Sequence, residues 1–294
     1  MPSTASQATP VSLPDGPTIL HIGGGVIEVH VSTDGLRVSR TTLLEYVEHA
    51  ARAMANYYGH FPVARVQVEI TPGGGGRRIN GRESNGRHIS LGIGTAATDA
   101  KIAHDWTATH EMFHLAFPDL DSRYNWMNEG LSDYLEPIAR ARIGQLTPED
   151  VWRGFVEGMP QGLPQPGDKG LDNTHTWANT YWGGNIYWLL ADVQIREQTH
   201  NRRSLDDALR AILKAGGNGG AHWPISRVLE VGDRATGTAV LADLHQKMGP
   251  TPFAPDLDAL WKQLGVRHDN GQISFNDAAP LAAVRKAITA RDGR

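Results

Sequence analysis

The chain contains no cysteine, and this absence removes several kinds of chemistry at once. Disulfide bonds, thiolate metal ligands and a cysteine nucleophile are all excluded. A chain without cysteine is compatible with the cytoplasm and also with an export route. The composition therefore leaves the compartment open.

Long apolar runs and runs of like charge are also missing from the 294 residues. No run approaches the roughly 20 apolar residues of a membrane span, so we expect no span. The formal net charge is -4, with acidic and basic residues interleaved, which argues against a nucleic-acid partner. The length allows one large domain or two subdomains with a sizeable core, and it does not set the oligomeric state.

The first 17 residues are polar and rich in Pro, Ser and Thr, and they lack a basic segment followed by an apolar one. We predict a flexible leader over 1–17. Such a start also suits a mature protein from which a signal peptide has been removed. Localisation thus has two hypotheses, periplasmic or secreted in that case and cytoplasmic otherwise.

Hydrophobic periodicity indicates how the rest of the chain is organised. Alternation of apolar and polar residues predicts strands over 18–22, 26–31, 63–70 and 88–93, and helical spacing predicts a helix over 41–59. The stretch 71–87 is expected to be a loop. These elements predict a mixed subdomain over 18–118 that contains an antiparallel sheet.

Beyond Gly94 the pattern is helical. One helix, capped by Thr98 or Asp99, is expected to carry "HEMFH" in apolar surroundings that include Trp106; others are expected over 125–143 and 148–156 and from near 181, 204, 225 and 255. The long loop over 158–180 favours a functional role over filler. We predict an α+β fold with a helical subdomain over 119–294.

His110 and His114 are four residues apart on the first of these helices. This spacing puts both rings on one face, about 6 Å apart along the axis, so they can bind one ion. Imidazole suits Zn²⁺, and a catalytic zinc site uses three protein ligands. Glu111, the residue after His110, lies too far around the helix to join the coordination plane of the two histidines easily. It can reach the water that attacks the substrate, where a general base is needed. Zn²⁺ is the predicted cofactor.

Four carboxylates compete for the third ligand position, namely Asp119, Asp121, Glu129 and Asp133. The first two fall in a connecting loop, where a turn or cap role is more ordinary. Glu129 and Asp133 share a face of the next helix because they are four residues apart. One of them can bind the metal while the other accepts a hydrogen bond from a metal-binding imidazole.

The pairing of "HEMFH" with "WMNEGLSDYLE" resembles the gluzincin metallopeptidases, which share a thermolysin-like catalytic fold. Together with "MANYYGHFPVARVQVEI" and "TYWGGNIYWLLADV", these segments are most similar to the glycyl aminopeptidase family, over roughly residues 45 to 265. The resemblance implies His110, His114 and Glu129 as zinc ligands, Glu111 as the base and Asp133 as support for a ligand. Only 14 residues, 115–128, separate the second histidine from Glu129, and at the relatives' spacing the ligand position would fall on Asp133.

The same resemblance assigns Tyr181 as the phenol that binds the oxyanion of the reaction. For substrate binding we expect Glu83, the only acid between the predicted strands, and the glycine run around Gly74 and Gly75, where a ligand can approach the backbone. Leu91 lies on the strand that we expect to be the sheet edge, where substrate backbone can pair. No PDZ-like segment is found, although family members often carry that domain.

The sequence thus predicts a zinc metallopeptidase that acts on peptide or protein substrates. The resemblance includes aminopeptidases, but the glutamate motif with which they hold a substrate amino terminus has no clear match in this chain. Two alternatives stay open. One is an inactive protein that binds zinc and peptide, and the other is a gluzincin hydrolase acting on a non-peptide substrate.

Overall fold

The computed structural model describes residues 11–12 and 16–291, and the chain divides into two compact units at Ala116. Most of the leader predicted over 1–17 lies outside the described residues. Within it, Val11–Ser12 form a short strand, β1, that pairs with the next strand. The two units are described in turn.

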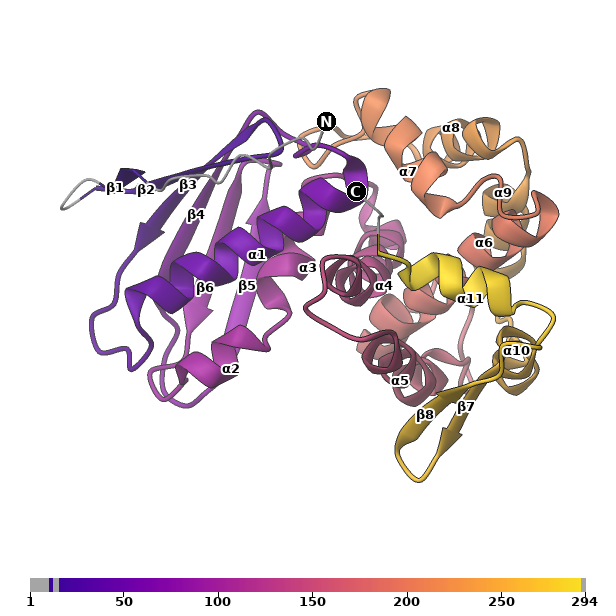
Figure 1. Cartoon of the computed structure of the whole chain (residues 1–294). Coiled ribbons are helices and arrows are strands. Elements are labelled where there is room, and N and C mark those ends of the chain that lie inside the picture. Colours follow the sequence, from indigo (N-terminus) through magenta and orange to yellow (C-terminus); the bar gives the residue numbers. More distant parts are fainter. Residues whose placement is uncertain (1–10, 13–15, 292–294) are drawn as a thin grey trace, which may run out of the picture. The chain divides into compact units, whose positions relative to one another are not determined.

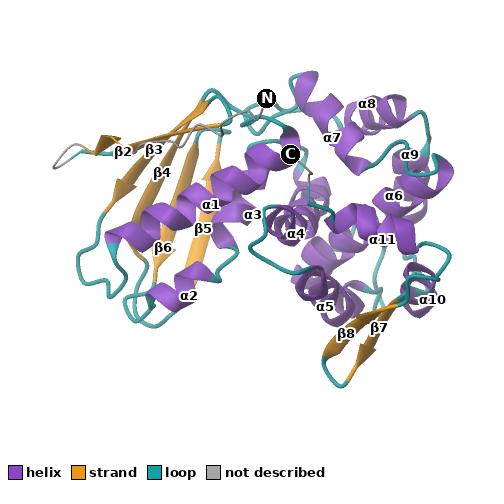
Figure 2. Ribbon diagram, in the orientation of Figure 1, coloured by secondary structure: helices purple, strands orange, loops and turns teal. Residues whose placement is uncertain are grey.

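The amino-terminal unit is built on a six-stranded sheet with the order β1-β2-β3-β4-β6-β5 (Figure 2). Its other strands are β2 (Thr18–Ile22), β3 (Gly25–Val31), β4 (Arg65–Pro72), β5 (Ile79–Ser84) and β6 (His88–Ile93). Alternate residues of β4, namely Val66, Val68 and Ile70, are fully buried, as the period of two predicted. Helix α1 (Arg40–Tyr58) runs along one face of this sheet (Figure 1).

The prediction of an antiparallel sheet is wrong, because the sheet is mixed. β3 pairs with β4 in parallel and β4 pairs with β6 in parallel, while the remaining pairs are antiparallel. The reason is the connection: α1 carries the chain from the end of β3 back to the start of β4, as in any crossover between parallel strands. Periodicity within a strand cannot reveal this.

The stretch 71–87 is not only a loop, because it contains β5. This strand forms a hairpin with β6 through a turn at Asn85 and Gly86, both of which have positive φ. An Asn-Gly pair is the preferred centre of such a turn. Consequently β6 lies between β4 and β5, and the predicted edge strand 88–93 is internal; β5 is the edge.

The single helix predicted around "HEMFH" is two helices, α2 (Asp99–Ala103) and α3 (Thr107–His114). The hydroxyl of Thr98 caps α2 by accepting from the Lys101 N–H. The chain bends at Asp105, whose carboxylate accepts from the Thr107 N–H at 2.9 Å and so starts a new helix. Trp106, which we expected to be buried, is 46% exposed.

The carboxy-terminal unit is mostly helical, as predicted. The helices are α4 (Asn125–Arg142), α5 (Pro148–Gly158), α6 (Gly184–Gln198), α7 (Leu205–Lys214), α8 (Ile225–Thr236), α9 (Val240–Met248), α10 (Leu257–Leu264) and α11 (Ala282–Thr289), with the short turns η1 (Ser122–Tyr124), η2 (Met159–Gly162) and η3 (Asn179–Gly183). Ser204 and Asp207 form the predicted capping box of α7. No described helix is both long enough and apolar enough to cross a membrane.

Two helices and one hairpin of this unit were not predicted. These are α9, α11 and the hairpin of β7 (Val266–Asp269) with β8 (Gln272–Phe275). All four elements are short, with at most nine residues each. The overall α+β class is nevertheless the predicted one.

Candidate metal centre

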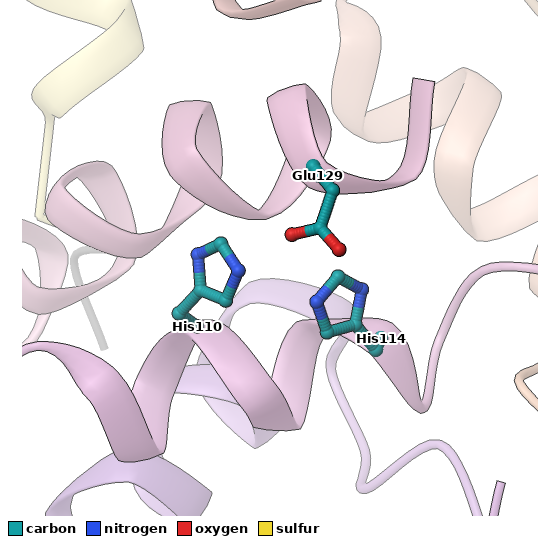
Figure 3. Close-up of side chains that lie close together, drawn as sticks. All are labelled: His110, His114 and Glu129. Carbon is teal, nitrogen blue, oxygen red and sulfur yellow. The ribbon is translucent and has the colours of Figure 1, made fainter. Parts of the chain in front are cut away.

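His110 and His114 lie one turn apart on α3, and their ring centroids are 5.0 Å apart. Seven consecutive residues of this helix, from Thr107 to Phe113, are buried, and His110 is 3% exposed. In Figure 3 both imidazoles project from the same side of α3. The helix thus presents two nitrogen ligands, one buried and one partly exposed.

A buried hydrogen-bond network holds the start of α3. The Tyr46 hydroxyl, from α1, donates to Asp105 Oδ1 at 2.7 Å and accepts from the Ala108 N–H at 2.8 Å. The Thr107 N–H donates to the same carboxylate oxygen, and Lys101 Nζ lies 2.9 Å from Asp105 Oδ2. N–H groups in the first turn of a helix have no partner within the helix, so these contacts supply one.

The network changes the pKa of both of its central groups. Burial, reinforced by the charge of Asp105, raises the pKa of Tyr46 well above its ordinary value, so the phenol keeps its proton and donates it. Burial by itself raises the pKa of Asp105, but hydrogen bonds from Tyr46, Thr107 and Lys101 outweigh it and lower that pKa. Asp105 is therefore a carboxylate at neutral pH.

Glu111, between the two histidines, packs directly against the backbone of β5. Its Oε2 accepts a hydrogen bond from the Glu83 N–H at 2.8 Å, and the residue is 9% exposed. A Cβ placed on Gly81 would lie 2.4 Å from Glu111 Cγ and 2.7 Å from Glu111 Oε1. Only glycine fits at that position while Glu111 keeps its place. The edge strand therefore sets the position of this carboxylate.

Glu129 lies in the second turn of α4, where the helix packs closely on α6. A Cβ on Gly130 would lie 2.4 Å from the Gly184 Cα, so the two backbones approach to a distance that only glycine allows. Asn128 Nδ2 donates to the Pro118 carbonyl at 3.3 Å, which ties the start of α4 to the preceding segment. These contacts position the helix turn that carries the glutamate.

The structure brings His110, His114 and Glu129 together. One ligand atom from each lies within 4.8 Å of the other two, and Figure 3 shows the carboxylate extending from α4 toward the two rings. Within residues 11–12 and 16–291, no other group of three histidine or acidic side chains meets this criterion. Asp133, the competing ligand, is not part of the group.

The chemistry of this donor set fits a divalent metal. Two neutral imidazoles and one carboxylate are a common ligand set of catalytic zinc sites, in which the fourth position is left open. Metal–ligand bonds of about 2.0–2.2 Å place tetrahedral ligands roughly 3.4 Å apart. In this structure the three ligand atoms lie within 4.8 Å of one another. The cluster can therefore hold a metal ion.

Asp119 and Asp121, the remaining candidate ligands, have another partner. His222 Nδ1 lies 2.9 Å from Asp119 Oδ2, and its Nε2 lies 3.4 Å from Asp121 Oδ1. The two carboxylates contact different nitrogens of the ring, so the imidazole of His222 bridges the two aspartates. The three side chains do not converge on one point as metal ligands would. The loop and turn role expected for these aspartates agrees with this arrangement.

Tyr181 lies in η3, a turn of π-helix that leads into α6. The turn is anchored by Asn179, whose Nδ2 donates to Asp168 Oδ2 at 3.1 Å and whose N–H donates to the Thr176 hydroxyl. π-helical turns occur often at functional sites. The sequence predicts the start of a helix near Tyr181, but it does not indicate that the first turn is π-helical.

The residues expected to bind substrate lie in different surroundings. Leu91 is 1% exposed on the internal strand β6, so that expectation is wrong: its side chain belongs to the core and both edges of its strand are paired. Gly74 and Gly75 lie in the exposed β4–β5 loop, and Gly74 has a φ of +91°. The Glu83 carboxylate accepts from the Gly86 N–H and so stabilises the hairpin turn.

The contact between Gly81, Glu83 and Glu111 was not predicted. The Asn85-Gly86 pair was the signal that would have found it, because it predicts a hairpin turn and so makes the preceding residues a strand. In the structure Ser84 pairs with His88, and three residues form the loop. Strand β5 contributes the backbone N–H that orients Glu111. The sequence alone does not show that β5 and α3 meet.

Comparisons with known proteins place the fold. No protein-family model matches the sequence, and no curated protein is similar to it. Among solved structures, an aminopeptidase N family protein from Idiomarina loihiensis matches with a TM-score of 0.62 and 11% identity, over 93% of this chain and 53% of that chain. The chain thus spans about half the length of that protein.

Two further structures are similar at comparable levels. An M1 zinc metallopeptidase from Deinococcus radiodurans, in a mutant form bound to a Tyr-Ser-Ala substrate, matches with a TM-score of 0.54 and 15% identity over 84% of this chain and 52% of that chain. Native yeast LTA4 hydrolase matches with a TM-score of 0.52 and 15% identity over 84% and 40%. At these identities the likeness concerns the fold, and the chain folds like part of the M1 zinc metallopeptidases.

Proposed function

We propose that the chain is a zinc-dependent metallopeptidase that hydrolyses bonds in peptide or protein substrates. The observation that carries this proposal is the cluster of His110, His114 and Glu129, with Glu111 between the two histidines on the same helix. The fold supports it, because the similar structures include an M1 zinc metallopeptidase with a bound peptide substrate. The finer assignment is a thermolysin-like gluzincin, most like the glycyl aminopeptidases.

Each residue has a defined task in this proposal. Zn²⁺ held by His110, His114 and Glu129 would supply Lewis-acid chemistry, polarising the scissile carbonyl and making the attacking water more acidic. The Glu111 carboxylate takes a proton from that water and later passes it to the leaving amine. The Glu83 N–H orients the carboxylate for this transfer by occupying one of its oxygens.

Two further side chains complete the proposed site. The Tyr181 hydroxyl donates a hydrogen bond to the oxyanion, whose charge develops only in the transition state. Asp133 accepts a hydrogen bond from a metal-binding imidazole and so fixes its orientation. Substrate backbone pairs with β5, the strand at the sheet edge, in place of the internal β6.

The proposal is tested by metal analysis together with a peptide digest read by mass spectrometry. We expect about one zinc per chain and cleavage of a peptide library by the wild type. Glu111→Gln should retain the zinc and lose hydrolysis by roughly 10²-fold or more, because it removes the general base. Glu45→Gln, which changes an exposed glutamate on α1, is the matched control and should cleave normally.

The outcomes separate the proposal from its rivals. A metal-free, inactive wild type would refute the zinc peptidase. Zinc and peptide binding without cleavage would indicate the inactive binding protein, and substantial turnover by Glu111→Gln would exclude Glu111 as the base. Removal of single residues from the amino terminus would indicate an aminopeptidase, whereas internal cuts would indicate an endopeptidase.

A further inference from the structure

Trp177 is the more exposed of the two tryptophans, Trp106 and Trp177, that lie largely at the surface of the described structure. Most of the other tryptophans are core residues, and Trp126, Trp152 and Trp188 are 2% exposed or less. Trp177 is 61% exposed, which leaves on the order of 100 Å² of aromatic surface in water. An exposed surface of this size on one rigid ring is a feature of binding sites, where aromatic side chains supply contact area at low entropic cost.

The exposed ring is also adjacent to a residue of the proposed site. Trp177 stacks on Tyr181, with ring centroids 5.6 Å apart and an interplanar angle of 28°. The residue after Tyr181, Trp182, packs its ring against Gly158 instead. A Cβ on Gly158 would lie 2.0 Å from a carbon of that ring. The π-helical turn therefore directs one tryptophan inward and leaves Tyr181 beside the exposed one.

The backbone around Trp177 is held in place by hydrogen bonds. The Thr180 N–H donates to the Thr176 carbonyl at 2.9 Å, and the Asn179 N–H donates to the Thr176 hydroxyl at 3.2 Å. Asp168 accepts from Asn179 and from the Gln165 N–H. The ring is thus presented by an ordered turn, so little conformational entropy is lost when something binds to it.

The charges nearby favour an uncharged ligand. The loop 163–178 contains two acids, and both already have partners in the protein. Asp168 is held within the loop by two N–H groups. Asp172 accepts from Trp126 Nε1 at 3.0 Å and pairs with His245 Nε2 at 3.0 Å. An apolar or aromatic side chain can stack on the Trp177 ring without needing any carboxylate.

From these observations we infer that Trp177 is a substrate-contacting, specificity-determining residue. Its exposed face receives an apolar or aromatic side chain of the peptide near the scissile bond, while its other contact holds the Tyr181 ring. The inference rests on the proposed function and deepens it by naming the substrate class. A purely structural role, in which Trp177 only braces Tyr181, is the reading that the experiment must exclude.

The test uses two hexapeptides with free termini, one containing Phe and Leu and the other with those residues replaced by Ser. Cleavage by the wild type, Trp177→Ala and Trp177→Phe gives kcat and KM, and binding to the same proteins carrying Glu111→Gln gives Kd. We expect Trp177→Ala to raise KM and Kd for the apolar peptide by about tenfold. Both constants should stay almost unchanged for the Ser peptide. Trp177→Phe should be intermediate.

Phe275→Ala is the matched control, because Phe275 is a partly exposed aromatic residue of the same unit on β8 and does not line the cavity beside Asp168 and Asn179. It should leave the preference between the peptides unchanged. If Trp177→Ala lowers kcat equally for both peptides without changing KM or Kd, the residue only braces Tyr181 and the inference is overturned. A wild type that lacks zinc and cleaves neither peptide would refute the proposed function, while the Kd values would still decide the role of Trp177.

Discussion

At the scale of single residues, the position of Glu111 depends on the absence of a side chain at Gly81. Gly81 faces the glutamate side chain across β5, and the Glu83 N–H donates to its carboxylate at 2.8 Å. A general base must keep within hydrogen-bond reach of the proton that it accepts, so a displacement of about 1 Å matters for rate. A glycine without any role in binding or chemistry thus becomes a positioning residue.

We therefore predict that Gly81→Ala lowers kcat/KM by about 10²-fold while zinc content stays normal. The new methyl group would lie 2.4 Å from Glu111 Cγ, so the glutamate must move or β5 must shift. Such overpacking also lowers the free energy of unfolding by about 1–3 kcal/mol. Peptide cleavage, metal analysis and chemical denaturation measure the three quantities.

Gly154→Ala is the control for that substitution. Gly154 is exposed on α5, and a Cβ there would have no atom within 4 Å. The variant should keep full activity and gain slightly in stability, because alanine favours a helix over glycine. Full activity of Gly81→Ala would mean that β5 does not position the base.

At the scale of elements, α3 owes its place to the network at its first turn. Asp105 connects α1 to α3 through the Tyr46 hydroxyl, and it is buried. Its lowered pKa means that the folded state binds its proton more weakly than the unfolded state does. The resulting stability is fully present above the ordinary carboxyl pKa of about 4 and is lost as pH falls through the lower pKa of the folded state.

Asp105→Asn should consequently destabilise the protein by about 1–3 kcal/mol at pH 7, because a carboxylate that accepts several hydrogen bonds is replaced by a neutral amide. The difference from the wild type should shrink as pH falls below about 4, where the unfolded chain takes up this proton, and vanish below the lower pKa of the folded state. Denaturant unfolding at pH 7, 5 and 3 measures it. Asp34→Asn, at an exposed loop position, is the control, and a difference that does not change with pH would contradict the role given to the charge.

The elements also show where sequence reasoning succeeds. Helix α1 and strand β4 were predictable because each buries one face, and the apolar period of each is regular. β5 was missed because Asn80, Gly81 and Ser84 are poor strand formers and its outer edge has no partner strand. The β5–β6 and β7–β8 hairpins nevertheless each contain an Asn-Gly turn with positive φ, which is readable from the sequence.

At the scale of the whole molecule, the candidate site combines local and distant information. The spacing of His110 and His114 is local, so it could be read from the sequence, and a resemblance to gluzincins suggested Glu129. The parallel pairing of β3 with β4 and the contact of β5 with α3 depend on how the chain returns to the same sheet. No pattern within a single element encodes such contacts.

The segment before α4 illustrates another long-range contact. Asp119 forms a bridge with the segment 221–223, in which its N–H donates to the Ala221 carbonyl and its carbonyl accepts from the Trp223 N–H. His222 adds a side-chain contact to Asp119 and Asp121. More than 100 residues of chain are thereby closed into a loop next to the helix that carries Glu129.

This bridge should respond to pH because the hydrogen bond to Asp119, aided by the charge of Asp121, raises the pKa of His222. The folded state then binds the imidazole proton more tightly than the unfolded state does. The stability that results is fully present below the ordinary histidine pKa of about 6.5, and it is lost as pH rises through the raised pKa of the folded state.

His222→Ala should therefore lower Tm at pH 5.5 and have little effect at pH 9. His175→Ala, at an exposed loop position of the same unit, controls for the loss of a histidine. An equal fall in Tm at both pH values would show that the ring stabilises the segment by packing, without a contribution from its charge.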